Sequence, residues 1–202
     1  VIHVTGTNGK TSTSRMAQSL VKAHGLRTGL FTSPHLTSVR ERIQIDGEPI
    51  GSEEFIRLWQ EIEPIIELVD ARSTEAGGPR MSFFEVLTVL AFVAFADAPV
   101  DVAVIEVGMG GTWDATNVVD AEVAVIGPIA VDHERWLGST IAEIAAEKAG
   151  IVKAGSFAIT AQQVPSAFEV LGPALAAARE SVVEGDEFEV VHRDPAVGGQ
   201  VV

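Results

Sequence analysis

The chain has 202 residues, 47% of them hydrophobic, so it can bury one good core and a single globular domain is expected. Its 14 basic and 28 acidic residues give a formal net charge of −14, which argues against binding to nucleic acid or to an anionic membrane through bulk electrostatics. Cysteine is absent, which excludes disulfides and thiolate metal sites. Anionic ligands must then be held locally, by loops and metal ions.

The longest apolar run, 86–96, contains Thr88 and has the length of a buried helix rather than of a membrane span. The first residue already lies in an apolar, strand-like run over 1–4, without a signal peptide or a polar lead-in. We therefore expect a cytoplasmic protein whose true N-terminus is missing from this chain.

The most informative segment is 6–11, Gly-Thr-Asn-Gly-Lys-Thr, which directly follows the strand-like run. Glycines allow backbone N–H groups to face an anion, Lys10 can reach the outer phosphates of a nucleotide, and the Thr11 hydroxyl can contact magnesium. Apolar residues at helical spacing follow over 11–24 before a stop at Gly25. The loop is therefore predicted to lie at a helix N-terminus.

The general P-loop pattern is not met as written, because it requires glycine at the position of Val4. A simple glycine turn between a strand and a helix is the alternative interpretation of this segment.

Strand-like and helix-like segments alternate along the rest of the chain, which is the pattern of a parallel sheet covered by helices. We predict strands over 28–31, 100–107, 121–126, 156–161 and 188–191, and a hairpin arm over 42–45 before Asp46-Gly47. We predict helices over 52–70, 82–96 and 140–150, with a loop at 77–79 and capping boxes at Ser82 with Glu85 and Thr140 with Glu143. The expected fold class is α/β, with a doubly wound and mainly parallel sheet.

In such sheets ligands bind at the carboxyl ends of the strands. The strand 100–107 delivers Glu106 there, followed by glycine-rich backbone that suits close approach to a ligand. A carboxylate in a buried strand is costly unless it is paired or binds metal. The alternative for Glu106 is an acidic residue in a turn or at a helix start.

His133 follows the strand 121–126 at the same edge, and the alternative is a histidine with only a structural role. Lys148 lies in the last turn of a predicted helix before Gly150. The partial negative charge at a helix C-terminus favours a cation there, so Lys148 needs no functional explanation on these grounds.

Seven motifs, in order, resemble the Mur ligase superfamily and, within it, the dihydrofolate and folylpolyglutamate synthases. They are Gly-Thr-Asn-Gly-Lys at 6–10, Thr-Ser-Pro-His-Leu at 32–36, Phe-Phe-Glu at 83–85, Glu-Val-Gly at 106–108, Asp-Ala-Thr-Asn at 114–117, Asp-His at 132–133 and Glu-Lys-Ala-Gly-Ile at 147–151. The resemblance implies a central ATP-binding domain over 1–202, with an N-terminal segment and a C-terminal Rossmann-like domain absent from this chain.

Enzymes of this family use ATP to phosphorylate a carboxylate, and an amine then attacks the acyl phosphate to give an amide, ADP and phosphate. For this branch the resemblance implies dihydropteroate or a folate as acceptor and L-glutamate as amine. Phosphoryl transfer of this kind depends on positioning and charge neutralisation. The resemblance further implies a monomer that acts on small molecules, with neither nucleic acid nor membrane as a partner.

The resemblance assigns roles to particular residues. It implies ATP contacts from Gly6, Thr7, Asn8, Gly9, Lys10, Thr11 and Ser12. It implies one magnesium ion held by Thr11, Ser33 and Glu106, and a second held by Glu106, His133 and Lys148, with Lys148 carrying a carbamate made from carbon dioxide. The catalytic set would be Lys10, Glu106, His133 and Lys148. Because magnesium rarely takes imidazole, the His133 contact would be weak or water-mediated.

The same resemblance implies folate contacts from Pro34, His35, Phe84, Glu85, Asp114 and Ala115. An aromatic ring for stacking and a carboxylate for an aminopyrimidine edge are the contacts that a pterin requires. Each has a structural alternative, because Phe84 could pack in the core, Glu85 could cap a helix and Asp114 could cap a turn.

Three places depart from the family pattern. Thr112 stands where arginine is common, Gly127 stands where threonine is usual, and Glu134-Arg135 follow His133. An arginine missing beside the phosphates could weaken turnover. One alternative is therefore that the chain is a catalytically impaired nucleotide-binding fragment. A cell-wall Mur peptide ligase acting on a nucleotide sugar is the other, although the motifs at 32–35 and 84–85 favour folate.

Overall fold

The computed structural model describes residues 1–191, 194–196 and 199–201, with side chains up to residue 191. Its main sheet has eight strands in the order β4-β3-β2-β5-β1-β6-β7-β8. The strands are β1 (Ile2–Thr5), β2 (Thr28–Phe31), β3 (Ile43–Ile45), β4 (Glu48–Pro49), β5 (Val102–Glu106), β6 (Val123–Ile126), β7 (Phe157–Thr160) and β8 (Glu180–Val183). Only the hairpin strands β3 and β4 pair antiparallel in this sheet, so the predicted mainly parallel α/β class is confirmed.

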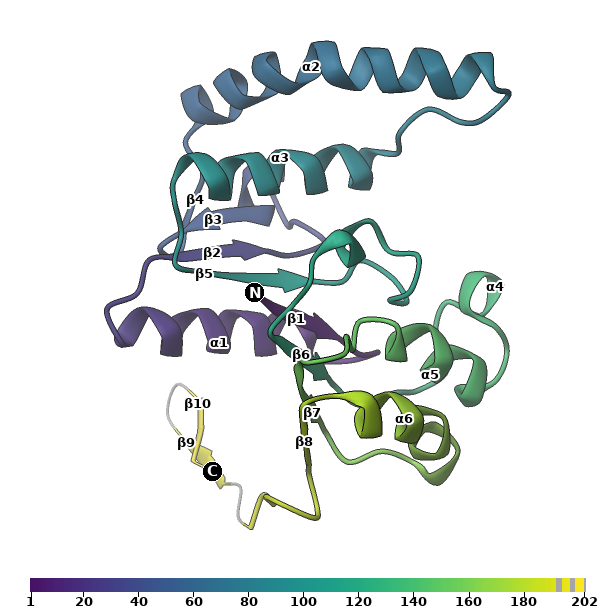
Figure 1. The fold of residues 1–202 in the computed structure, drawn as a ribbon. Coiled ribbons are helices and arrows are strands. Elements are labelled where there is room, and N and C mark those ends of the chain that lie inside the picture. The colour runs from purple at the N-terminus through teal and green to yellow at the C-terminus, as the bar shows by residue number, and fades with distance from the viewer. Residues whose placement is uncertain (192–193, 197–198, 202) are drawn as a thin grey trace.

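Helices cover both faces of the sheet. α1 (Lys10–Ala23) packs its Ala17 against Val4 and Leu30 on one face. The opposite face is covered by α3 (Phe83–Asp97), α5 (Ile141–Ala149) and α6 (Pro165–Ala177). α2 (Ser52–Glu75) lies on the outer side of α3, as Figure 1 shows. Two short 3₁₀ helices, η1 (Val39–Arg42) and η2 (Ala115–Val118), and α4 (Glu134–Leu137) complete the main domain.

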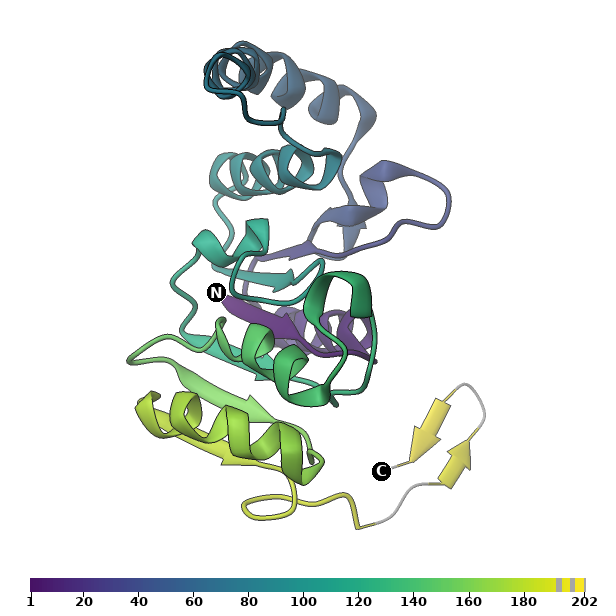
Figure 2. The ribbon, with the colours of Figure 1, turned by 90° about the vertical axis from the view of Figure 1, so that its right-hand side faces the viewer.

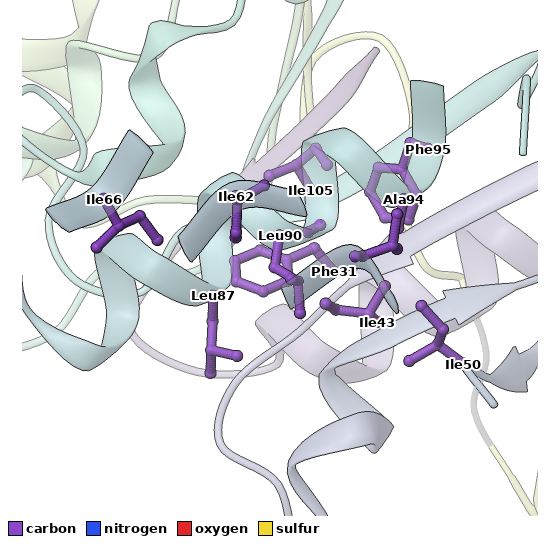
Figure 3. Close-up of a cluster of buried hydrophobic side chains, with 12 residues drawn as sticks. Phe31, Ile43, Ile50, Ile62, Ile66, Leu87, Leu90, Ala94, Phe95 and Ile105 are labelled. Atoms are coloured by element: carbon purple, nitrogen blue, oxygen red, sulfur yellow. The ribbon is translucent and has the colours of Figure 1, made fainter. Parts of the chain in front are cut away.

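The largest hydrophobic cluster joins α2, α3 and the β2–β3–β5 side of the sheet, as drawn in Figure 3. α3 is apolar nearly all round because it is enclosed between α2 and the sheet. α2 instead buries one stripe, Leu58, Ile62 and Ile66, at a four-residue spacing. Each fully buried side chain of this size contributes about 1.5–3 kcal/mol, so this cluster stabilises the β2–β3 side of the sheet.

Most predicted elements are confirmed, including the strands at 28–31 and 100–107, the Asp46-Gly47 hairpin, and the capping boxes of α3 and α5. The helix predicted over 52–70 continues to Glu75. The strand predicted at 188–191 is wrong: only Phe188 makes an isolated bridge, to Glu184, and Val191 is 82% exposed. The sheet ends instead at β8.

A separate two-stranded hairpin, β9 (Asp194–Ala196) with β10 (Gly199–Val201), follows the main domain, and Figure 2 shows it beyond the edge of the sheet. Within the described part of the chain, no helix is long and apolar enough to cross a membrane.

Candidate active site

The loop between β1 and α1 is shaped by two glycines with positive φ. Gly6 has φ 144° and Gly9 has φ 79°, both in the region that side chains with a Cβ rarely adopt. Gly9 is the N-cap of α1 and offers no side-chain cap, so the first N–H groups of the helix are free to meet an anion. They face a hollow of about 330 Å³, and the predicted position of this loop at a helix N-terminus is confirmed.

The hollow is lined by the predicted phosphate-binding residues together with the neighbouring β2 loop and strand β5. Its lining consists of Thr7, Asn8, Gly9, Lys10, Thr11, Ser12, Ser33, Pro34 and Glu106. Thr7 anchors the loop, because its N–H donates to the carbonyl of Pro128 at 2.9 Å and its hydroxyl donates to the carbonyl of Ala130 at 3.0 Å.

Two lysine ammonium groups converge on one carbonyl of this loop. Lys10 Nζ and Lys148 Nζ donate to the Gly6 oxygen at 3.1 and 2.9 Å. Lys148 is only 3% exposed, and burial together with the Lys10 charge lowers the pKa of its amine to about 8. The carboxylates of Asp132 and Asp114 act in the opposite direction. Near neutral pH, Lys148 therefore has an appreciable fraction of uncharged amine.

Glu106 is a buried carboxylate held by oxygen and nitrogen donors. The Thr11 hydroxyl lies 2.9 and 3.0 Å from its two oxygens, and the Ser33 N–H donates to it at 3.2 Å. Burial raises the pKa of Glu106, and these hydrogen bonds only partly offset that effect. A carboxylate beside two hydroxyl-bearing residues is a donor set that fits a hard divalent cation. The described residues include no cluster of three or more His, Cys, Asp or Glu side chains for a metal, so phosphate oxygens and water would complete its shell.

A larger cavity of about 600 Å³ opens beside this hollow. Among the predicted residues, its wall contains Lys10, Ser33, Pro34, Phe84, Glu85, Asp114, Ala115 and His133. The wall also contains five residues that were not predicted to bind a ligand, Arg42, Ser82, Gly108, Met109 and Trp113. His35 is not among the wall residues. Its Nδ1 accepts a hydrogen bond from Arg42 Nε at 2.9 Å.

Phe84 serves both the core and the cavity wall. Its ring packs on Phe31 at a centroid distance of 5.7 Å. A Cβ at position 108 would lie 2.5 Å from Phe84 Cζ, so glycine there is what allows the ring to lie against the loop after β5. Glu85 accepts from the Ser82 N–H at 2.6 Å in the capping box of α3, as its structural alternative predicted.

Asp114 belongs to a buried polar chain that reaches the central strand. Its carboxylate accepts from the N–H groups of Met109 and Thr116, both at 3.0 Å, and from the Thr116 hydroxyl. Because that hydroxyl donates to Asp114, it accepts from His3 Nε2, 2.9 Å away. His3 is fully buried with Nδ1 unpartnered, and burial lowers its pKa to about 4, so it is neutral. A histidine inside the apolar run 1–4 was the available signal for this network.

The structure separates the two predicted metal sets. Thr11 and Ser33 contact Glu106 directly. His133 instead lies at the start of α4 with φ 52°, half exposed, and its Nε2 is 3.6 Å from a carboxylate oxygen of Asp132. Lys148 contacts the Gly6 carbonyl rather than Glu106. The assignment of His133 and Lys148 to a second metal ion stays a prediction.

Thr112, one of the departures from the family pattern, has a structural role. Its N–H and hydroxyl both donate to the Glu147 carbonyl, at 2.9 and 3.1 Å. These bonds join the loop after β5 to the last turn of α5, which carries Lys148. Thr112 therefore positions an element of the site without itself lining the cavity.

A glycine-rich loop between β1 and α1, at the carboxyl edge of a mainly parallel sheet, defines an α/β domain with a P-loop-type anion site. The Mur ligase middle domain family model matches residues 4–171, and the chain belongs to this family.

Among curated relatives, the dihydrofolate synthase/folylpolyglutamate synthase of Mycobacterium tuberculosis is 54% identical over 211 residues, covering all of this chain and 43% of the relative. The Bacillus subtilis protein with the same description is 44% identical, covering 84% of this chain and 39% of its own.

The similar solved structures are also of folylpolyglutamate synthases. Mycobacterium tuberculosis folylpolyglutamate synthase complexed with ADP superposes with a TM-score of 0.92 at 54% identity, covering 99% of this chain and 45% of that one. An FPGS–AMPPCP–folate complex superposes with a TM-score of 0.91 at 38% identity, covering 98% of this chain and 48% of that one. The chain thus spans less than half the length of these relatives.

Proposed function

We propose that this chain is the ATP-binding middle domain, over 1–202, of a ligase that joins L-glutamate to dihydropteroate or a folate through an acyl phosphate. One observation carries the proposal: the phosphate-loop hollow and the larger cavity share Lys10, Ser33 and Pro34. A nucleotide whose outer phosphate lies on the loop would therefore meet a molecule that occupies the cavity. The names of the relatives and the AMPPCP and folate in their complexes support this pair of ligands.

The loop would act on the phosphates through charge. The free N–H groups at the start of α1 would hold the β- and γ-phosphates, and Lys10 would exchange the Gly6 carbonyl for the transferred phosphoryl group. The acceptor carboxylate forms a bond to phosphorus as the bond to ADP breaks. The glutamate amine then attacks the acyl carbon, the carbon–oxygen bond to phosphate breaks, phosphate leaves with the bonding electrons, and the nitrogen releases a proton to solvent.

Magnesium fits the first predicted set, in which Thr11, Ser33 and Glu106 would hold it. When bound, it would supply positive charge that neutralises the phosphate oxygens. A second ion on Glu106, His133 and Lys148 requires the Lys148 carbamate. A pKa of about 8 favours that modification, because carbon dioxide reacts with an uncharged amine.

The cavity wall favours a flat aromatic acceptor over the nucleotide sugar of a cell-wall ligase. Phe84, Met109 and the half-exposed Trp113 give it apolar surface for stacking. A substrate panel of dihydropteroate, folate and UDP-linked peptides, assayed with each candidate amino acid, separates these two functions. That the protein is cytoplasmic and monomeric stays a prediction.

Lys10→Ala in the full-length protein tests the proposal. We expect ligation to fall at least about 100-fold, as measured by ADP release with dihydropteroate and glutamate, because the variant removes the side-chain cation of the loop. Lys22→Ala is the matched control, since Lys22 lies in the last turn of the same helix and contacts the Asp46 carbonyl instead. Equal turnover by the two variants would refute the site, and no turnover by the unmodified protein would favour the impaired-fragment alternative.

A further inference from the structure

Arg42 lies on the cavity wall, and its guanidinium is oriented without a carboxylate in direct contact among the described residues. Burial lowers the pKa of Arg42, and the charge of Glu106 only partly offsets that effect. It ends η1 and directly precedes β3. Its Nε donates to His35 Nδ1 at 2.9 Å, and its guanidinium lies 5.4 Å from the centre of the Phe83 ring. Across the described residues, neither Nη1 nor Nη2 donates to an acceptor, and no carboxylate lies within 4.0 Å.

Two other arginines, in contrast, have their Nη groups bound to acceptors. Arg57 on α2 is saturated by Glu54, Glu61 and Asp97. Arg40, two residues earlier in η1, donates through Nη1 to the Ile50 carbonyl at 2.8 Å. Arg42 is instead half-buried, and its backbone is fixed because its carbonyl accepts from the Thr32 N–H at 3.0 Å.

The nearby acidic residues have other partners than Arg42. Glu106, whose charge acts on Arg42 without direct contact, accepts from Thr11 and Ser33. Asp114 accepts three hydrogen bonds from Met109 and Thr116. Glu85 is engaged in the capping box of α3. The two free Nη groups of Arg42 therefore present a flat pair of donors, whose geometry matches the two oxygens of a carboxylate.

We propose that Arg42 binds a carboxylate of the acceptor molecule in the cavity, and that His35 positions the guanidinium. His35 can accept from Nε only while its Nδ1 is unprotonated, and that bond directs Nη1 and Nη2 towards the ligand. The proposal rests on the proposed function, because it takes the acceptor to be a carboxylic acid. In this proposal His35 contacts Arg42 and does not contact the ligand itself.

The test measures the affinity of the full-length protein for dihydropteroate and for its carboxamide, by titration calorimetry. Arg42→Gln is expected to weaken dihydropteroate binding at least about tenfold while leaving carboxamide binding unchanged, so that the preference for the acid disappears. Arg40→Gln is the matched control from the same short helix and should keep the preference. AMPPCP affinity reports on the phosphate loop and should be the same in all three proteins.

His35→Ala should weaken dihydropteroate binding less than Arg42→Gln does, and the double variant should bind no more weakly than Arg42→Gln alone. A variant at position 42 that still prefers the acid, or that loses both ligands equally, overturns the role of Arg42. If the unmodified protein binds AMPPCP but neither dihydropteroate nor a folate, the proposed acceptor is wrong and this inference falls with it. Turnover of dihydropteroate by the unmodified protein with an unchanged KM in Arg42→Gln overturns the inference alone.

Discussion

At the scale of single residues, Glu106 shows how a binding group is kept at a cost to the fold. Its side chain is 1% exposed and has no cationic partner in direct contact among the described residues. Burial raises its pKa, so the folded protein disfavours the charged form that a metal ion would need. Such a group is expected where binding of a ligand, rather than folding, keeps the residue charged.

Glu106→Gln should therefore separate stability from activity. We expect a higher melting temperature without ligands, because an uncharged amide replaces a desolvated carboxylate of similar shape. The magnesium concentration for half-maximal ligation should rise at least about tenfold, since even outer-sphere partners of metal ligands contribute about 10–100-fold to metal affinity. Thermal melts and a magnesium titration check both parts. A lower melting temperature together with an unchanged magnesium requirement would contradict this account of Glu106.

The residues that the sequence identified are mostly those with local signatures. Lys10 and Thr11 follow a glycine loop, and Glu106 ends an apolar strand, so each could be placed at the sheet edge from its own neighbourhood. Arg42 could not, because its significance depends on having no carboxylate in direct contact among the described residues. The position of His35 behind Arg42 also depends on a side-chain contact across seven residues, which spacing alone does not encode.

At the scale of elements, β1 carries two functions on its two faces. Val4 packs against α1, whereas His3 on the opposite face connects through Thr116 to Asp114. The strand that presents the phosphate loop thus also supports the wall of the larger cavity. This coupling depends on a neutral His3, because a protonated ring would place a charge in a fully buried position.

The protein should lose stability as the pH falls because of His3. Its pKa is about 4 in the folded protein against an ordinary 6.5, so between these values the unfolded chain binds a proton that the folded chain does not. The contribution is complete above pH 6.5 and is lost towards pH 4, amounting to about 3 kcal/mol in full.

In His3→Gln the stability gap to the unmodified protein should therefore shrink between pH 7.5 and pH 5, by about 2 kcal/mol. Urea unfolding followed by tryptophan fluorescence measures it. His24→Gln, at an exposed position after α1, serves as the control and should leave the pH dependence unchanged. A constant gap between His3→Gln and the unmodified protein would show that His3 is already protonated or only loosely buried.

Elements with strong local signals were predicted well, and the edge of the sheet was not. α3 and α5 begin at capping boxes, and the hairpin turns at Asp46-Gly47, all of which are local signals. β8 consists of a half-exposed Glu-Ser-Val-Val segment whose strand character comes from pairing with β7. The run 188–191 is more apolar but has no neighbouring strand to pair with beyond one bridge, so composition favoured the wrong segment.

At the scale of the whole molecule, most of the predicted site residues line two adjoining hollows at one edge of the sheet. The phosphate loop, Glu106 and the cavity wall are thus all within this chain. The cavity is nevertheless bounded by exposed side chains, with Trp113 51% exposed and His133 half exposed. The curated relative from Mycobacterium tuberculosis has more than half of its length outside the match.

We therefore predict that the isolated 202-residue chain binds AMPPCP but forms amide at least about 100-fold more slowly than the full-length protein. An acyl phosphate must be shielded from water and met by a positioned amine, and an open cavity provides neither. Mass spectrometry of the glutamylated product measures the two rates, with Lys10→Ala in the isolated chain giving the background. Circular dichroism and AMPPCP titration establish that the isolated chain is folded. Turnover by the folded chain at a rate close to that of the full-length protein would show that these residues alone contain the glutamate site and exclude water from the intermediate.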